Sequence, residues 1–174
     1  IKMKIKKTKI KDCFEIYTKE LSDFRGSFSR IFCEDILKKN KIKFNIRQVN
    51  FARTLKKGTF RGFHYQVTPY SETKIVMCVK GEIFDVVIDL RKKSKTYKKI
   101  FQTKLNSDEN KLIYIPRGCA HGYLSLKPNT EILYFVDNFY KSSSERGIRF
   151  DDSKIKIKWP IKIETVSKKD LSWK

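Results

Sequence analysis

The stretch Lys74-Ile-Val-Met-Cys-Val-Lys-Gly-Glu-Ile-Phe-Asp-Val-Val-Ile-Asp-Leu90 decides the fold of this chain. Two runs rich in β-branched residues flank Gly81-Glu82, a pattern typical of two strands joined at a glycine turn. Outward from it, apolar and polar residues mostly alternate with a period of two. Further strands are therefore expected at Thr59–Gln66, Lys111–Ile115, Gly122–Leu126 and Glu131–Asn138.

Helical spacing occurs only in Ser22–Asn40, through Phe32, Ile36 and Leu37. Glu34 and Asp35 suit the first turn of a short helix near residues 33–39. Many short strands with regular turns and one short helix predict an all-β fold, a jelly-roll β-sandwich or barrel. The length of 174 residues, without a repeat or a low-complexity linker, predicts one domain over residues 1–174.

The composition indicates a soluble cytoplasmic protein. No run approaches the roughly 18 apolar residues that a membrane helix requires, and the basic amino terminus leads into no apolar signal core. The cysteines are scattered and form no C-x-x-C pair, so reduced thiols are expected. With only two histidines they make a poor zinc set, and no metal is expected. The four cysteines are Cys13, Cys33, Cys78 and Cys119.

The net charge of +21 raises the question of nucleic-acid binding, because basic patches bind phosphate backbones. The lysines, however, are spread from Lys2 to Lys174 in doublets such as Lys56-Lys57. This spread favours a solvated lysine-rich surface and no nucleic-acid partner. Attraction of a small anionic substrate is compatible with it.

The two histidines of the chain each lie in a compact motif beside glycine. His64 lies in Arg61–Gln66, and His121 lies in Ile115–Gly122. Imidazole exchanges a proton near neutral pH, so both are candidates for acid–base work. Each can equally be a hydrogen-bonded core histidine, and the residues alone leave both readings open.

Strand alternation assigns faces to the candidate residues. In Thr59–Gln66 it puts Phe60 and His64 on one face and Arg61 on the other, so that Arg61 shares a site with His64 only through a bulge or a second subunit. In Glu131–Tyr140 the even positions form a mostly apolar row that includes Tyr134. Tyr134 therefore points inward, as a site residue or as a core tyrosine.

Several motifs in the right order resemble those of a known family. The chain resembles the nucleotide-diphosphosugar epimerases typified by dTDP-4-dehydrorhamnose 3,5-epimerase, which have a cupin-like jelly-roll fold. The resemblance runs from residue 23 to residue 170. Its landmarks are Lys57–Gln66, Gly81–Arg91, Ile115–Gly122, Glu145–Arg149, Asp151-Asp152 and Ile157–Pro160.

The resemblance implies epimerisation without a cofactor at C3, C5 or both of a nucleotide-diphospho-4-keto-6-deoxy sugar, in the synthesis of a surface glycan such as lipopolysaccharide or capsule. The C4 ketone makes the neighbouring protons acidic, so a base and an acid on opposite ring faces invert a centre. By the resemblance His64 is the base, Asp170 orients it, and Tyr134 is the proton donor. Lys74 matches a lysine that offsets the enolate charge.

The resemblance also implies a homodimer, with residues 48–52 against the partner, and a set of substrate-binding residues. Arg25 and Arg61 match arginines that hold the diphosphate. Gln48 and Asn50 match a Gln-x-Asn segment that contacts the nucleotide, and Phe28 matches a place beside the base. Glu145 keeps the alternative of a turn cap, and His121 keeps that of a core residue. The remaining binding residues implied are Tyr140 and Lys169.

Departures from the family pattern leave the substrate partly open. Arg30 stands near a family glutamate in the nucleotide region, and Thr73-Lys74 replaces a Gly-Lys pair. The nucleotide base and the number of inverted carbons therefore stay undecided at this point. The alternatives are a ketoisomerase on the same scaffold and a non-catalytic sugar-nucleotide-binding cupin. A metal-dependent cupin is disfavoured because two histidines in separate motifs supply too few ligands.

Overall fold

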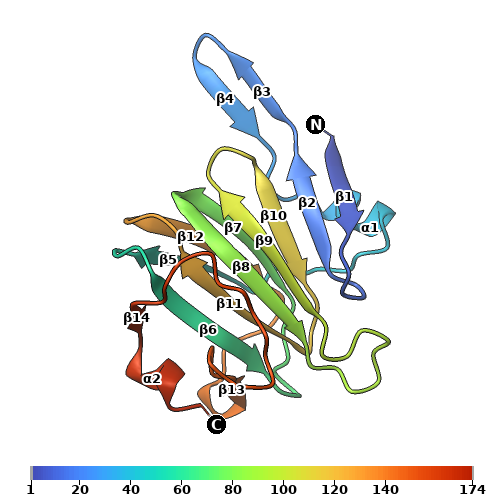
Figure 1. Cartoon of the computed structure of the whole chain (residues 1–174). Helices are drawn as coiled ribbons and strands as arrows, with labels where there is room; N and C mark the ends of the chain where they lie inside the picture. Colours follow the sequence, from blue (N-terminus) through green and yellow to red (C-terminus); the bar gives the residue numbers. More distant parts are fainter. Residues whose placement is uncertain (1, 174) are drawn as a thin grey trace.

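Two antiparallel β-sheets face each other in the computed structural model, which describes residues 2–173 (Figure 1). Their strands confirm the expected β-sandwich. In spatial order, the first sheet consists of β1 (Met3–Lys7), β2 (Phe14–Thr18), β10 (Lys111–Ile115), β7 (Lys74–Lys80), β12 (Thr130–Val136) and β5 (Gln48–Thr54). The second consists of β13 (Glu145–Gly147), β6 (Thr59–Gln66), β11 (Cys119–Ser125), β8 (Glu82–Asp89) and β9 (Ile100–Asn106), and β14 (Thr165–Val166) runs parallel to β6.

The stretch from Lys74 to Leu90 forms β7 and β8 as expected, but these two strands belong to different sheets. The chain crosses from one sheet to the other at Gly81, whose φ of +81° is accessible to glycine. A Cβ there would also lie 2.6 Å from Oγ1 of Thr130. The glycine therefore marks a corner of the sandwich.

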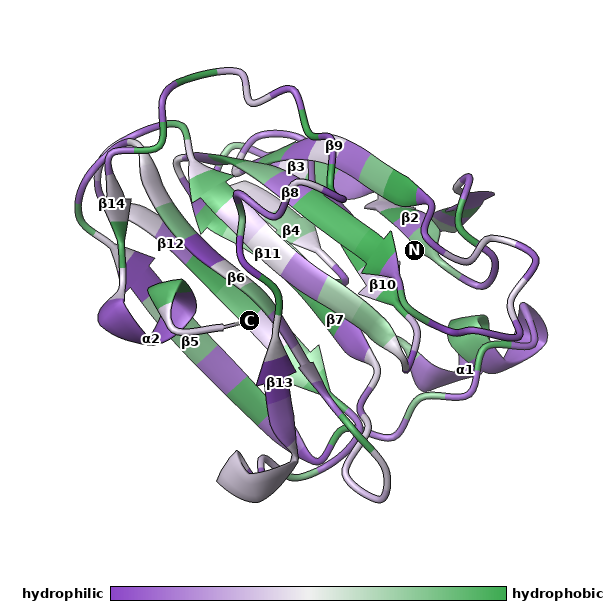
Figure 2. Cartoon of the chain, turned by 60° about the horizontal axis from the view of Figure 1, so that its bottom comes forward, coloured by the Kyte–Doolittle hydropathy of each residue, from purple (hydrophilic) through white to green (hydrophobic). Residues whose placement is uncertain are grey.

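Both faces of the central strands are buried, which explains their almost continuous apolar sequence. Val76 of β7 and Val87 of β8 meet in the cluster between the sheets. Ile75 and Met77 face the opposite way, against Leu37, Ile42 and Phe44 of the segment around α1 (Glu34–Lys39). The outer face of the second sheet is covered by residues 148–163, through Ile155, Ile157, Trp159, Ile161 and Ile163. Along β5, polar and apolar residues alternate in Figure 2, because only the face with Ala52 joins the cluster between the sheets and the opposite face is exposed.

The expectation of helix in Ser22–Asn40 is confirmed at α1 and wrong before it. Residues 20–29 form a hairpin of β3 (Glu20–Asp23) and β4 (Gly26–Ser29), which projects beyond the two sheets in Figure 1. The Asp23 carboxylate accepts a hydrogen bond from the backbone N–H of Arg25 at 2.9 Å, an Asx turn that bends the chain back. A short 3₁₀ turn (Ser142–Ser144) and α2 (Lys168–Leu171) complete the helices of the described residues.

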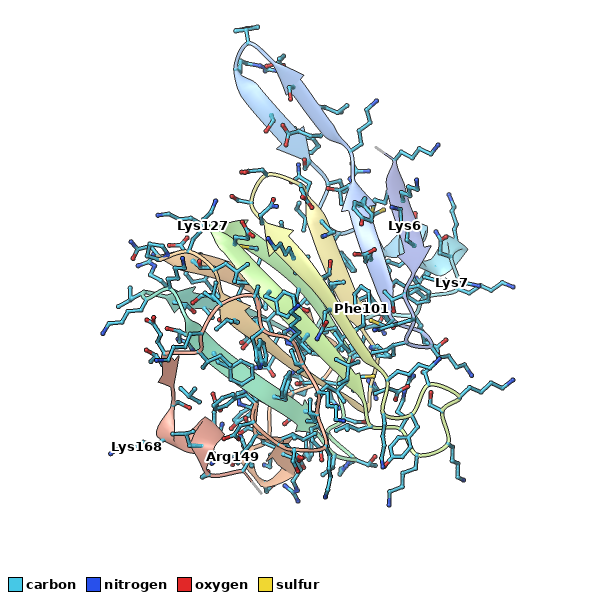
Figure 3. All side chains as sticks on the ribbon, viewed as in Figure 1. Lys6, Lys7, Phe101, Lys127, Arg149 and Lys168 are labelled. Carbon is cyan, nitrogen blue, oxygen red and sulfur yellow. The ribbon has the colours of Figure 1, made fainter. Side chains whose placement is uncertain are left out.

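The positive charge lies all round the molecule. Lys6 and Lys7 of β1, Lys127 between β11 and β12, and Lys168 of α2 project from different parts of the molecule in Figure 3. Of the helices described, none is long and apolar enough to cross a membrane. The surface therefore has the spread of lysines that the sequence indicated.

Candidate active site

A bulge in β6 decides where the site residues point. His64 pairs with His121, and Arg61 pairs with Tyr123, so β6 has one residue more than β11 between these pairs. The extra residue reverses the alternation of faces along β6. Phe60 therefore packs in the cluster on the outer face of the sheet, whereas Arg61 and His64 line one cavity. The expectation that Phe60 and His64 share a face is wrong, and of the two explanations offered for Arg61 the bulge is the right one.

Gly62 makes the bulge possible. Its φ is +137°, a conformation that other residues rarely adopt. A Cβ at this position would lie 2.5 Å from Cα of Gly122 and 2.9 Å from the carbonyl oxygen of His121. The paired glycines let β6 and β11 approach closely beside the two histidines.

Asp170 reaches His64 from the segment that follows β14. Pairing of β14 with β6 sets the position of this segment, and the Ser167 hydroxyl accepts a hydrogen bond from the backbone N–H of Asp170 at 3.0 Å. The Asp170 carboxylate then lies 2.6 Å from Nε2 of His64 and accepts a second bond from the N–H of Gly62. Although burial opposes it, the hydrogen bond with His64 lowers the pKa of Asp170. Because Nε2 donates to the carboxylate, Nδ1 is the ring nitrogen left to accept a proton.

Two adjoining cavities lie between the sheets and share His64, Lys74, Tyr134 and Glu145. Both have polar walls. The first is also lined by Gln48, Asn50, Tyr65, Gln66, Glu72, Val136 and Tyr140. The second is also lined by Ala52, Arg61, His121, Tyr123, Ile132 and Lys169.

Tyr134 and Lys74 face His64 from the opposite sheet. Tyr134 points inward as expected, while its neighbours Leu133 and Phe135 pack on the outer face of β12. Burial, followed by the negative charge of Glu72, raises the pKa of Tyr134, so its phenol stays protonated. The ammonium of Lys74 lies 3.2 Å from a carboxylate oxygen of Glu72. The site thus combines an oriented imidazole, a neutral phenol and a cation.

His121 forms a second histidine–aspartate pair, with its Nε2 2.6 Å from Oδ2 of Asp85. Both side chains are almost fully buried, and Oδ1 of Asp85 has no hydrogen-bond partner among the described residues. Asp85 is not among the residues predicted from the sequence. A lone acid inside the apolar run of β8 was the signal for it, since such acids are buried only when paired.

At the rim, Glu145 accepts hydrogen bonds from Lys169 at 2.6 Å and from the Tyr140 hydroxyl at 2.8 Å. These bonds lower the pKa of Glu145 although its burial opposes the shift. The Gln48 side-chain oxygen accepts a bond from the backbone N–H of Tyr140 at 2.6 Å. The rim residues of β5, β13, α2 and the loop at Tyr140 therefore hold one another in place.

Most of the residues selected from the sequence lie together, and two do not. Arg25 and Phe28 lie on the β3–β4 hairpin, where Arg25 pairs with Asp23 and Phe28 is 58% exposed. Like Asp85, the lining residue Glu72 was not predicted from the sequence. Among residues 2–173, no three His, Cys, Asp or Glu side chains are grouped closely enough to hold a metal ion.

Comparisons with known proteins point to one family. The sequence profile described as dTDP-4-dehydrorhamnose 3,5-epimerase matches residues 7–174. The enzyme of that name from Shigella flexneri is 37% identical over 173 residues, 98% of this chain and 94% of its own. The crystal structure of the Bacillus anthracis enzyme with TDP and PPi bound has a TM-score of 0.96 at 31% identity, covering 99% of both chains. A 3'-monoepimerase from Streptomyces bikiniensis in complex with dTDP-quinovose has a TM-score of 0.86 at 27% identity, covering 93% of this chain and 82% of its own.

Proposed function

We propose, from the premise that the chain belongs to the dTDP-4-dehydrorhamnose 3,5-epimerase family, that His64 is the base with which this isomerase epimerises a nucleotide-diphospho-4-keto-6-deoxy sugar. The observation that carries the assignment is the 2.6 Å contact between His64 and Asp170 at a cavity that Lys74 and Tyr134 also line. Binding alone does not require such an acid–base set. The alternative of a non-catalytic sugar-nucleotide-binding cupin is correspondingly weaker.

In the proposed reaction, Nδ1 of His64 takes the proton from the sugar carbon beside the C4 ketone. Asp170 keeps Nε2 protonated and favours the imidazolium that forms. The electron pair left on the carbon spreads onto the C4 oxygen as an enolate, which the Lys74 ammonium stabilises. Tyr134 then delivers a proton to the opposite face of the ring, and the centre is inverted.

We propose that the remaining lining residues hold the nucleotide and the diphosphate. The second cavity is rich in cationic side chains, because Arg61, Lys74 and Lys169 lie around it, and forked or paired donors suit phosphate oxygens. His121 also lines this cavity. Gln48, Asn50 and Tyr140 offer polar and aromatic contacts to the nucleoside at the first cavity. Relatives bound to TDP or dTDP-quinovose support thymine as the base.

A homodimer is the second part of this proposal. β5 is the edge strand of its sheet, and Val49 and Phe51 on its outer face are 51% and 54% exposed. Edge strands with exposed apolar side chains favour pairing with another chain. A partner packed along residues 48–52 could present its own β3–β4 hairpin, so that Arg25 and Phe28 reach the cavity of the other subunit.

The number of carbons inverted has two candidate answers. Most relatives in the comparison are 3,5-epimerases, which supports inversion at both C3 and C5. The similarity to a 3'-monoepimerase favours a single-centre enzyme as the second candidate. We further propose that residues 1–174 form one cupin-like domain that acts without a cofactor. We place it in the cytoplasm because its four cysteines are free, as thiols are in a reducing compartment.

The test is a panel of 4-keto-6-deoxy sugars linked to dTDP, UDP, GDP or CDP, incubated with the protein and followed by proton NMR. The expected result is inversion at C3, C5 or both with the dTDP-linked substrate at the lowest KM. Binding of every sugar nucleotide without inversion of any would support the non-catalytic alternative instead. Transfer of the carbonyl to another carbon would support the ketoisomerase.

A further inference from the structure

One carboxylate at the site has no part in the reaction proposed above. Glu72 lies between β6 and β7 and lines the first cavity together with His64, Lys74 and Tyr134. Its side chain is only 10% exposed. Buried carboxylates are retained in proteins where a partner holds them, so its contacts indicate what it does.

The two carboxylate oxygens of Glu72 make different contacts. Oε1 lies 3.2 Å from the ammonium of Lys74, whose side chain is itself only 12% exposed. Oε2 accepts a hydrogen bond from Nε2 of Gln66 at 2.9 Å. Glu72 is the one hydrogen-bond or ion-pair partner of the Lys74 ammonium within residues 2–173.

Gln66 is held in turn by the backbone. Its Nε2 also points to the carbonyl oxygens of Tyr70 and Phe139, and its Oε1 accepts a bond from the N–H of Lys141 at 2.7 Å. The chain of contacts from Gln66 through Glu72 to Lys74 therefore ties the ammonium to the backbone of the two segments that hold Gln66. Supporting hydrogen bonds of this kind fix the position of a functional group more tightly than a single rotamer does.

We propose that Glu72 is a positioning residue of the epimerase, which holds the Lys74 ammonium against the sugar-binding cavity; this role rests on the proposed function of Lys74. A carboxylate beside a developing enolate opposes that negative charge on its own. Glu72 therefore does not stabilise the enolate itself, and its contact with Lys74 favours the reaction through the position of the ammonium. Its charge has a second consequence, because it adds to the burial that raises the pKa of Tyr134 and keeps the phenol protonated.

The test is Glu72→Gln, which keeps the shape of the side chain and removes its charge. With a dTDP-linked 4-keto-6-deoxy sugar we expect kcat to fall by about 10- to 100-fold, the scale of a displaced catalytic group. KM should stay within about twofold, because Glu72 holds no phosphate. The basic limb of the kcat profile should move to lower pH, because removing the negative charge lowers the pKa of Tyr134. Glu72→Asp keeps the charge but shortens the reach, so kcat should fall while the basic limb stays in place.

The matched control is Glu15→Gln in β2. Glu15 also lies beside a buried lysine of the same sheet, 3.9 Å from the Lys111 ammonium, but it lines neither cavity, and β10 separates its strand from β7. It should leave kcat and the pH profile unchanged. Affinity for dTDP, measured by calorimetry, and a cooperative melting transition establish that each variant is folded.

Comparing Glu72→Gln with Lys74→Gln separates this inference from the proposed function. Unchanged or increased kcat in Glu72→Gln, with an unmoved basic limb, overturns the role of Glu72. Full turnover in Lys74→Gln overturns the role of Lys74, whatever Glu72→Gln does. Loss of turnover in Lys74→Gln beside an unaffected Glu72→Gln leaves the proposed function standing and rejects only the positioning role.

Discussion

His64 and His121 are cross-strand partners in β6 and β11, and each ring lies 2.6 Å from a carboxylate through its Nε2. The two histidine–aspartate pairs differ in how far the imidazole is exposed to the cavities. The His64 side chain is 30% exposed and borders both cavities, whereas His121 is 9% exposed and borders only the second. A base must reach a proton on the substrate, so this difference in exposure supports the proposal that His64 is the base and that His121 only holds the substrate.

Replacing His64 with alanine should abolish nearly all turnover. No other side chain among the lining residues combines an unprotonated nitrogen with an orienting carboxylate at the same exposure, and removing a general base costs about 10²–10⁴ in rate. The measurement is steady-state kcat by NMR, with circular dichroism and dTDP affinity as controls for folding. A folded His64→Ala protein with nearly normal kcat contradicts the mechanism.

Asp170→Asn should change stability in a way that depends on pH. The hydrogen bond with His64 lowers the pKa of Asp170 in the folded protein despite its burial. A lowered pKa stabilises the fold above the unfolded pKa, which is about 3.9, and this stabilisation is lost as the pH falls through the folded pKa. The difference in free energy of unfolding between wild type and Asp170→Asn should therefore be full at pH 6 and shrink below about pH 4. Urea denaturation at several pH values measures it, and a difference independent of pH would contradict the assignment.

How far the sequence could predict the site is clearest in β6. The bounds of this strand, Thr59–Gln66, are predicted from the motif, but the face on which Phe60 lies is not. Strict alternation assumes a regular strand, whereas the pairing with β11 contains one extra residue. Gly62 was visible as a permissive position, yet only its close approach to Gly122 shows that the strand bulges there.

Long-range contacts account for the other differences. Residues 20–29 have no core to pack against in this chain, so neither helical nor strand periodicity describes them well. Glu72 stands in a short polar connection, where an acid ordinarily faces solvent. Its burial depends on Gln66 and Lys74 arriving from two strands, which local sequence does not encode.

Chelators should leave activity unchanged. The expectation rests on the acid–base set of His64, Tyr134 and Lys74, which is sufficient for proton transfer without a Lewis acid. The measurement is kcat before and after prolonged dialysis against EDTA, together with elemental analysis of the purified protein. One tightly bound transition metal per chain that turnover requires would contradict it.

Phe51→Asp should dissociate the proposed dimer. Phe51 is 54% exposed on the outer face of the edge strand β5, and burying a carboxylate at an apolar interface is unfavourable. We expect light scattering to change from dimer to monomer and affinity for dTDP to fall, because Arg25 would no longer reach a partner. Tyr97→Asp, at a 39% exposed aromatic between β8 and β9, is the matched control and should stay dimeric. A wild-type protein that is monomeric and active at assay concentration rules the proposal out.

Tyr134→Phe should separate proton abstraction from inversion. The substitution keeps the ring and its packing in the cluster between the sheets but removes the hydroxyl that delivers the second proton. His64 can still form the enolate, so in D₂O the variant should exchange substrate hydrogen at C3 or C5 at least about tenfold faster than it releases inverted product.

In the wild type, each inverted carbon should carry solvent deuterium, one for a single-centre enzyme and two for a double epimerase. Product that inverts without gaining deuterium would exclude the enolate route. Equal loss of exchange and inversion in Tyr134→Phe would instead assign the acid to Tyr140, which lies at the same cavity with its hydroxyl donating to Glu145, or to water. Tyr140→Phe is therefore the companion variant, and we expect it to raise KM while exchange and inversion keep their wild-type ratio.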